Sequence, residues 1–194
     1  MPVKTKNTTV KRIFIAIKIN PGNNLLRIHS SLKSVLGSER IKWDDPEKIH
    51  LTLAFLGDTE EERIKIAGLM LKRTCSGFGE FSFKLAGTGV FKDYRDPRVI
   101  WIGIEPSDKL NKLNDDIKRG LEDTGFKTED RPFRPHITIG RIKFIRDPVA
   151  LRSALEPYQS GFIQEVQVSE VILYESILKP SGAVYRTIGN FRLN

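Results

Sequence analysis

The stretch IHLTL at residues 49–53 recurs 86 residues later as PHITI at residues 135–139. Because side chains alternate between the two faces of a β-strand, the histidine and the threonine of each copy point the same way. These pairs are His50 with Thr52, and His136 with Thr138. The apolar residues beside them point to the opposite face, where a core can bury them. Each copy is therefore predicted to be a strand that presents an imidazole and a hydroxyl together.

The chain around the two copies alternates between strand-like and helix-like patterns. Apolar and β-branched runs predict strands at residues 10–19, 49–56, 81–90, 99–104, 136–144, 166–178 and 184–191. Helical spacing of apolar residues predicts helices at residues 23–36, 60–73, 108–122 and 148–158, with Thr59 and Ser107 as the N-caps of the second and third. This order indicates an α+β fold with substantial antiparallel pairing. The repeat favours two related halves around a central groove.

Length and composition limit the possible classes of protein. The 194 residues, 39% of them apolar, suffice for one core without disulfides, and no Pro/Gly/Ser-rich linker divides them. We expect a flexible N-terminal tail at residues 1–10 and a single domain at residues 11–194. The single cysteine, Cys75, excludes a disulfide framework and Cys-rich zinc patterns. A membrane span needs about 20 apolar residues, and no run in the sequence approaches that length. Residues 1–11 contain no apolar signal segment. We therefore expect a cytoplasmic protein. Nothing in the sequence favours a dimer, so we expect a monomer.

The net charge of +8 is concentrated in two segments. Residues 1–38 carry seven basic side chains and no acidic one, and residues 131–146 form a second acid-free stretch. Such patches attract anions, and phosphates are the obvious candidates. The alternative is an ordinary solvated surface, so charge suggests a phosphate-bearing partner without establishing one.

Two histidines that titrate near neutrality can act as one base and one acid at physiological pH. A cyclic phosphodiester needs both, because the attacking water must lose a proton and the departing ribose oxygen must gain one. Threonine hydroxyls can donate hydrogen bonds to the non-bridging oxygens, where negative charge is concentrated. This chemistry requires no metal. A zinc site is the other possibility, but two histidines fall short of the usual three protein ligands. The third possibility is that the motif histidines are packed residues with no chemical role. The remaining histidine, His29, is expected to lie at the surface or at its boundary.

The residues around both copies resemble the signatures of the two-histidine phosphoesterase superfamily. They are most similar to its RNA 2′,3′-cyclic phosphodiesterase branch, also called the 2′-5′ RNA ligase family. The resemblance covers roughly residues 11–191. It rests on Trp43 with IHLTLAFLG (49–57), and on RPFRPHITIGR (131–141). It is supported by RIFIAI (12–17), VIW (99–101), LYES (173–176), Gly182 and Tyr185.

This resemblance implies a bilobal α+β fold in which each lobe offers one His-x-Thr strand to a central cleft. It also implies metal-independent opening of a 2′,3′-cyclic phosphate to a 2′-phosphate, without a cofactor. By analogy, His136 would activate the water, His50 would protonate the leaving 3′ oxygen, and the two threonines would hold the phosphate. The substrates would be RNA with cyclic phosphate ends or cyclic nucleotides.

Two further substrate-binding residues are candidates. The family uses an arginine five residues after the second histidine, which is Arg141 here. In a regular strand Arg141 would face away from His136. A bulge at Gly140 could turn it back, and the alternative is a solvent-facing arginine at the end of the strand. Phe14 could form a stacking wall for a base or ribose, although an aromatic in an apolar strand is more often part of the core. Core positions are also expected for Trp43 and Trp101.

Two other functions remain open from the sequence. One is a non-catalytic RNA-binding module, which would not need two imidazoles and which lacks a recognisable RNA-binding motif. The other is reversible ligation of RNA through a 2′-5′ bond, which is the same chemistry in reverse.

Overall fold

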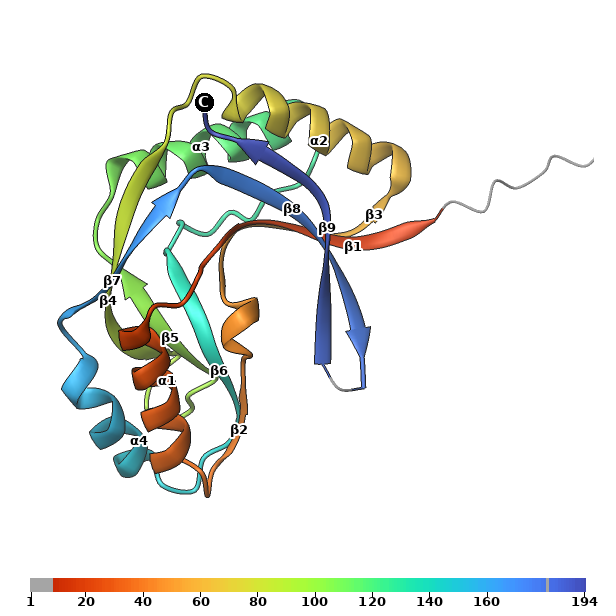
Figure 1. Ribbon diagram of the computed structural model, residues 1–194. Helices are drawn as coiled ribbons and strands as arrows, with labels where there is room; N and C mark the ends of the chain where they lie inside the picture. The colour runs from red at the N-terminus through yellow and green to blue at the C-terminus, as the bar shows by residue number, and fades with distance from the viewer. Residues whose placement is uncertain (1–8, 181) are drawn as a thin grey trace, which may run out of the picture.

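The computed structural model describes residues 9–180 and 182–194 (Figure 1). Its strands are β1 (Val10–Lys18), β2 (Arg40–Trp43), β3 (His50–Glu60), β4 (Phe81–Phe91), β5 (Val99–Ile104), β6 (His136–Phe144), β7 (Phe162–Val168), β8 (Glu170–Lys179) and β9 (Gly182–Arg192). Its α-helices are α1 (Asn23–Val35), α2 (Glu61–Cys75), α3 (Asp108–Asp123) and α4 (Pro148–Leu155), and short 3₁₀ turns lie at Pro46–Lys48 and Glu156–Tyr158. The mixture of elements confirms the expected α+β class.

All nine strands belong to one sheet with the order β7-β4-β5-β6-β3-β1-β8-β9, and β2 pairs with β6 beside this path. Every pairing is antiparallel. The sheet has two halves, β1-β3-β8-β9 and β2-β4-β5-β6-β7. They join where β3 meets β6, through a single registered pair, Leu51 with Ile137. The two His-x-Thr strands therefore lie side by side at the junction of the halves.

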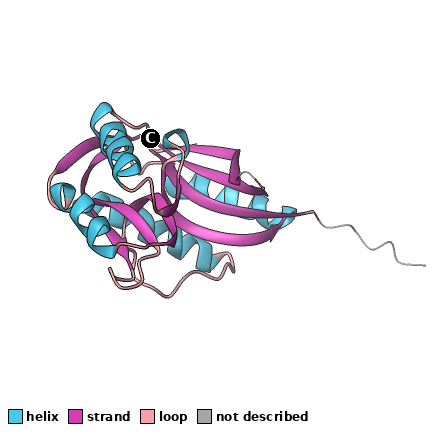
Figure 2. Ribbon diagram, turned by 90° about the horizontal axis from the view of Figure 1, so that it is seen from below, coloured by secondary structure: helices cyan, strands magenta, loops and turns pink. Residues whose placement is uncertain are grey.

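The helices cover the outside of each half. In Figure 1, α2 and α3 lie along the half that contains β3, β8 and β9, and α2 contacts all three strands. The helices α1 and α4 lie together on the other half, where α1 contacts β7. Figure 2, seen from below, shows helices in front of the strands on the left and behind the strands on the right. The buried apolar residues lie between strands and helices, and alternate residues of β1 (Ile13, Ile15 and Ile17) belong to this core.

Helix α3 begins at the N-cap that the sequence predicts, whereas α2 does not. The Ser107 side chain accepts a hydrogen bond from the backbone N–H of Leu110 at 3.4 Å, which caps α3. Thr59, in contrast, is still in β3, paired with Lys11 of β1, and its hydroxyl donates to the carbonyl of Gly57. The predicted N-cap at Thr59 is wrong because pairing with β1 extends β3 to Glu60.

Two strand assignments also differ from the sequence analysis. The predicted strand at 166–178 is two strands, β7 and β8, which belong to different halves of the sheet. The break is at Ser169, whose carbonyl accepts a hydrogen bond from the N–H of Leu193 at 2.8 Å. Strand β2 was not predicted. An apolar run shows that a segment is buried, but it does not show which strand the segment pairs with.

The predicted tail at residues 1–10 falls largely outside the described residues, because residues 1–8 are not among them. Val10 already belongs to β1 and pairs with Glu60. Among the described residues, no helix combines the length and the apolar character needed to cross a membrane.

Trp101 lies flat over two glycines of the half that carries β6. A Cβ atom on Gly89 would lie 2.4 Å from a ring carbon of Trp101, and a Cβ on Gly103 would lie 3.3 Å from another. Trp101 is paired with Thr138 and so shares its face of the sheet. The glycines therefore let a large ring pack next to the second His-x-Thr motif.

We predict that Gly89→Ala destabilises the protein by about 1–3 kcal/mol, because Trp101 must move out of its position. Gly68→Ala is the matched control. Gly68 lies inside α2, and a Cβ atom added there would be 3.8 Å from its nearest neighbouring atom, in the ring of Phe191. Alanine at this position should therefore stabilise the helix by about 0.5–1 kcal/mol. Urea unfolding measures both changes. Equal stabilities of the Gly89 variant and the wild type would contradict this packing.

Candidate active site

The His/Thr cluster, which we define as His50, Thr52, His136 and Thr138, is built by the junction of β3 and β6. In the antiparallel register around the pair of Leu51 and Ile137, His50 is opposite Thr138, and Thr52 is opposite His136. All four side chains are on the face opposite to Leu51 and Ile137, which are buried in the core. We call the face that carries the cluster the motif face. The structure thus brings the four predicted residues together, from positions 86 residues apart in the chain.

Both imidazoles are held in the same way. The Nδ1 atom of His50 bonds to the carbonyl of Lys48 at 2.8 Å, and the Nδ1 atom of His136 bonds to the carbonyl of Arg134 at 2.7 Å. A carbonyl oxygen can only accept, so Nδ1 must carry the proton in each ring. The Nε2 atom of each histidine is therefore the nitrogen left to take up or give up a proton.

Burial lowers the pKa of His50 and of His136 below the ordinary histidine value. In both rings the hydrogen bond to the backbone carbonyl opposes this shift, and the positive charge of Arg141 adds to it. The two differ in one respect, because the Asp44 carboxylate raises the pKa of His50 and no carboxylate acts on His136. The Asp44 carboxylate thus opposes the effect of burial at His50 and not at His136.

Aromatic rings fix the orientation of the two histidines. His50 lies 5.0 Å from Phe14 and 5.1 Å from Tyr185, measured between ring centroids, and Phe14 also stacks on Tyr174. His136 lies 4.6 Å from Phe91, edge to face. Phe14 is only 3% exposed, and its ring contacts His50, Tyr174 and Tyr185. The ring expected to form a stacking wall lies in the site, but it supports His50 and offers little free surface.

Arg141 reaches the motif face through a β-bulge. Ile100 of β5 pairs with Gly140 and Trp101 pairs with Thr138, so Ile139 is an extra residue in β6. Val99, two residues before Trp101, pairs with Arg141, which places Arg141 on the same face as Thr138. The predicted change of face is confirmed, with the bulge at the residue before Gly140. The Arg141 charge acts on both histidines.

Sequence reasoning missed Asp44, which follows directly after β2. Its backbone N–H donates to the carbonyl of Ile139 at 3.0 Å, and its own carbonyl accepts from Nε2 of His29 at 3.0 Å. His29 is 5% exposed and packs edge to face against Trp43, so its expected place at the surface is wrong. Burial raises the pKa of the Asp44 carboxyl, while the charges of Arg141 and His50 lower it. No sequence signal pointed to Asp44, because its position depends on the pairing of β2 with β6.

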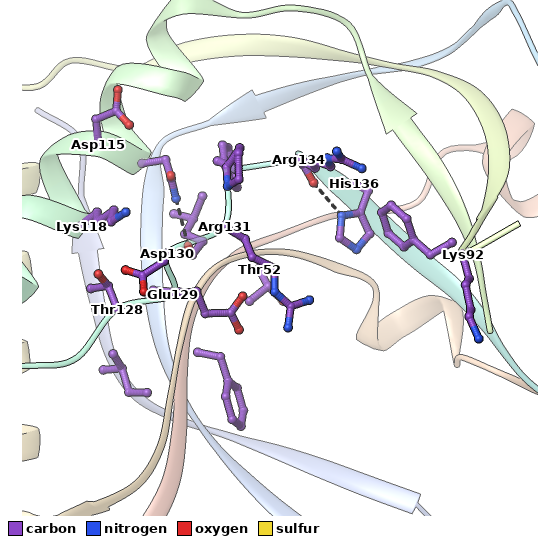
Figure 3. Close-up of a pocket in the computed structure, with 18 residues that line it drawn as sticks. Thr52, Lys92, Asp115, Lys118, Thr128, Glu129, Asp130, Arg131, Arg134 and His136 are labelled. Atoms are coloured by element: carbon purple, nitrogen blue, oxygen red, sulfur yellow. Dashed lines mark hydrogen bonds between the residues drawn. The ribbon is translucent and has the colours of Figure 1, made fainter. Parts of the chain in front are cut away.

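A pocket of about 890 Å³ opens beside the His/Thr cluster. Thr52 and His136 form part of its wall, and it continues along β3, past α3, to the loop at residues 128–134. Figure 3 shows Arg131 beside Thr52, with His136 and Lys92 further along the pocket. The buried side chain of Asn114 donates to the carbonyl of Leu53 at 2.9 Å and so holds β3 where β6 diverges from it. Among residues 9–180 and 182–194, no three His, Cys, Asp or Glu side chains are arranged to hold a metal ion.

The family model described as LigT like Phosphoesterase matches this chain twice, at residues 16–101 and 102–185. The chain belongs to this family of two-histidine phosphoesterases. Each match contains one His-x-Thr strand, β3 in the first and β6 in the second.

Curated relatives and solved structures are similar over nearly the whole chain. The RNA 2′,3′-cyclic phosphodiesterase of Thermotoga maritima is 36% identical over 91% of this chain and 92% of its own length. That of Methanothermobacter thermautotrophicus is 32% identical, over 94% and 98%. A crystal structure of a protein from Thermus thermophilus has a TM-score of 0.78 at 28% identity, over 94% of this chain and 97% of that one. Escherichia coli LigT, solved in complex with 3′-AMP, shares the fold with a TM-score of 0.71 at 24% identity, over 95% and 99%.

The hydrogen bonds of the three histidines predict their tautomers. In the neutral form, His50 and His136 should carry the proton on Nδ1, whereas His29 should carry it on Nε2, because Nε2 is bonded to the Asp44 carbonyl. All three should titrate below the ordinary pKa of about 6.5, because burial disfavours the charged ring. Nitrogen-15 NMR of the imidazoles measures both properties, and His29 serves as the internal control. The same tautomer at all three rings would contradict the arrangement.

Proposed function

We propose that this protein hydrolyses 2′,3′-cyclic phosphates, at RNA ends or on nucleosides, to 2′-phosphates through acid–base catalysis by two histidines. The observation that carries the proposal is the junction of β3 and β6, where the pair of Leu51 and Ile137 sets the two motifs side by side and where Nδ1 of each histidine is bonded to a backbone carbonyl, which leaves Nε2 for proton transfer. The relatives named RNA 2′,3′-cyclic phosphodiesterase support the same substrate class. A module that only binds RNA would not need two imidazoles held in one tautomer.

The proposed reaction is an in-line displacement at phosphorus. Nε2 of His136 takes a proton from water while the water oxygen forms a bond to phosphorus. The bond from phosphorus to the ribose O3′ breaks, and O3′ takes a proton from Nε2 of His50. The product is the 2′-monoester with a free 3′-hydroxyl. Exchange of protons with solvent then returns His136 to the neutral form and His50 to the charged form.

The remaining members of the cluster would hold the phosphate. The hydroxyls of Thr52 and Thr138 can donate to the non-bridging oxygens, and the Arg141 guanidinium supplies positive charge on the same face. Donors fixed in advance stabilise charge that develops in the transition state without reorganising when the reaction occurs. Phe14 would act through His50, because its ring is buried against that imidazole.

The roles of the two histidines follow from their electrostatic surroundings. The general acid must be protonated before the reaction, and a nearby carboxylate stabilises the charged imidazole. Of the two motif histidines, only His50 is affected by Asp44 in this way. We therefore assign His50 as the acid and His136 as the base. Because one chain supplies both histidines, the proposed site is complete in one copy, as a monomer requires.

We predict that the purified protein converts adenosine 2′,3′-cyclic phosphate to the 2′-monophosphate alone, in the presence of excess EDTA. His50→Ala and His136→Ala should each lower kcat by about 10²–10⁴-fold, because each removes one proton transfer. Chromatography that separates the 2′ from the 3′ product measures the reaction, and thermal unfolding of the variants is the control. Formation of the 3′-monophosphate would contradict the mechanism.

We predict that Asp44→Asn alters only the alkaline side of the pH profile of kcat/KM. Loss of the carboxylate lowers the pKa of His50, so the acid is deprotonated at lower pH and activity above neutrality falls. Activity on the acidic side should not change, because there it follows the protonation of His136. If His50 were the base, the same variant would instead gain activity on the acidic side.

A further inference from the structure

Lys42 lies on the motif face next to Arg141. Trp43 of β2 pairs with Gly140 of β6, and Lys42 pairs with Arg141 without a register shift between the two pairs. Because directly opposite residues of antiparallel strands share a face, Lys42 points to the same side of the sheet as Arg141. The motif face therefore carries a second cation, one strand away from Arg141 and outside the His/Thr cluster.

The hairpin of β8 and β9 ends in an arm that projects from the sheet. Strand β8 pairs with β1 only from Ile172 to Glu175, and the residues of β8 beyond this point pair with β9 alone. We call residues 176–179 and 182–185 the arm. In Figure 1 the arm points downward, beside the half that carries β2 and β6.

The arm spans the distance from His50 to Lys42. At its base, the Tyr185 ring lies 5.1 Å from the His50 ring, measured between centroids. At its tip, a Cβ atom added to Gly182 would lie 3.0 Å from Nζ of Lys42. The arm and β2 thus meet at the Lys42 ammonium, although they belong to different halves of the sheet. Lys42 therefore lies on the His50 side of the site.

Both cations of this surface are available to a ligand. Lys42 and Arg141 are exposed, and all ion pairs in the described part of the chain involve other basic side chains. Asp44 is a carboxylate near them: burial raises its pKa, and the charges of Arg141, His50 and Lys42 lower it. One carboxylate beside two permanent cations leaves this side of the site positive, which attracts phosphate groups.

The structure of the substrate indicates which phosphate comes near Lys42. At an RNA end with a 2′,3′-cyclic phosphate, the upstream chain is attached to C4′ through C5′, and C4′ is bonded to C3′. The chain therefore leaves the ribose on the side of O3′. If His50 protonates O3′, as the proposed function assigns, the chain continues past His50 toward the arm and Lys42. The first charged group on this path is the phosphodiester that joins the last two nucleotides.

We propose that Lys42 binds the phosphodiester that joins the last two nucleotides of an RNA substrate. Arg141 is assigned to the cyclic phosphate, so the two neighbouring cations hold successive phosphates. Gly182, at the tip of the arm, leaves room for the Lys42 side chain. This contact makes the protein prefer an RNA end to a cyclic mononucleotide. The inference rests on the proposed function, and the experiment below separates the two.

The test compares two dinucleotides that differ in one charge. Both end in a 2′,3′-cyclic phosphate, and their adenosines are joined by an ordinary phosphodiester in one and by an uncharged methylphosphonate in the other. The wild-type KM should be about three- to tenfold lower for the phosphodiester. In Lys42→Gln this difference should shrink to less than about twofold, because the charged partner is lost. The kcat should stay nearly the same, since the contact is present in substrate and transition state alike.

A third substrate and two further variants are the controls. Adenosine 2′,3′-cyclic phosphate has no upstream phosphodiester, so Lys42→Gln should leave its KM unchanged. Lys42→Arg keeps the charge and should preserve the difference between the dinucleotides. Lys72→Gln is the matched control, since Lys72 is an exposed lysine in the last turn of α2, on the helical side of the sheet. It should leave KM unchanged for all three substrates.

Three results would overturn the proposal. An equal rise of KM for all three substrates in Lys42→Gln would mean that Lys42 acts on the reaction centre through Asp44. An equal rise for the two dinucleotides alone would mean that Lys42 does not recognise the charge of the phosphodiester. An unchanged KM for all three substrates would mean that Lys42 does not contact the RNA.

If the wild type hydrolysed none of these substrates, the proposed function would fail. The contact would still be tested by calorimetric binding of the phosphodiester dinucleotide that ends in a 2′-monophosphate. Its Kd should rise about three- to tenfold in Lys42→Gln. An unchanged Kd would overturn the assignment of Lys42.

Discussion

The site depends on one contact between strands, the registered pair of Leu51 and Ile137. Burial of these two side chains fixes the register at the junction of the halves, because a shift of one residue would turn each histidine and threonine into the core. The same pair also decides that each histidine is opposite the threonine of the other motif. Two apolar residues thus determine the geometry of four polar ones, and the fold must supply helices on the far side of the sheet to bury them.

Two bulges change what the junction offers to a substrate. The extra residues Leu53 and Ile139 follow the threonines at equivalent places in the repeat, and each turns the residue five positions after the histidine toward the motif face. In one half this residue is Phe55 and in the other it is Arg141. The backbone has kept the symmetry of a duplicated unit, while the side chains differ. A directional reaction on an asymmetric nucleotide requires such a difference, because a fully symmetric site could not distinguish the leaving oxygen from the attacking one.

The sequence was sufficient for features that depend on local pattern. Strand alternation predicted the shared face of His50 and Thr52, the cap at Ser107 predicted the start of α3, and the isolated glycine at 140 predicted a bulge beside Arg141. Features that depend on long-range pairing were missed. Asp44 and His29 meet because β2 lies on β6, and the division of 166–178 into β7 and β8 reflects two different partner strands. The exposure of an aromatic ring is also a tertiary property, so the sequence left both a stacking role and a core position open for Phe14.

The two histidines are held in the same way, since each is bonded to the carbonyl two residues before it, and burial lowers the pKa of both. Local structure therefore cannot decide which one is the acid. The decision comes from Asp44, which a different strand brings near His50 only. Once His50 is the acid, the leaving O3′ must lie on its side, and the orientation of the whole nucleotide follows. In this account one carboxylate, supplied by the segment after β2, sets the direction of proton transfer.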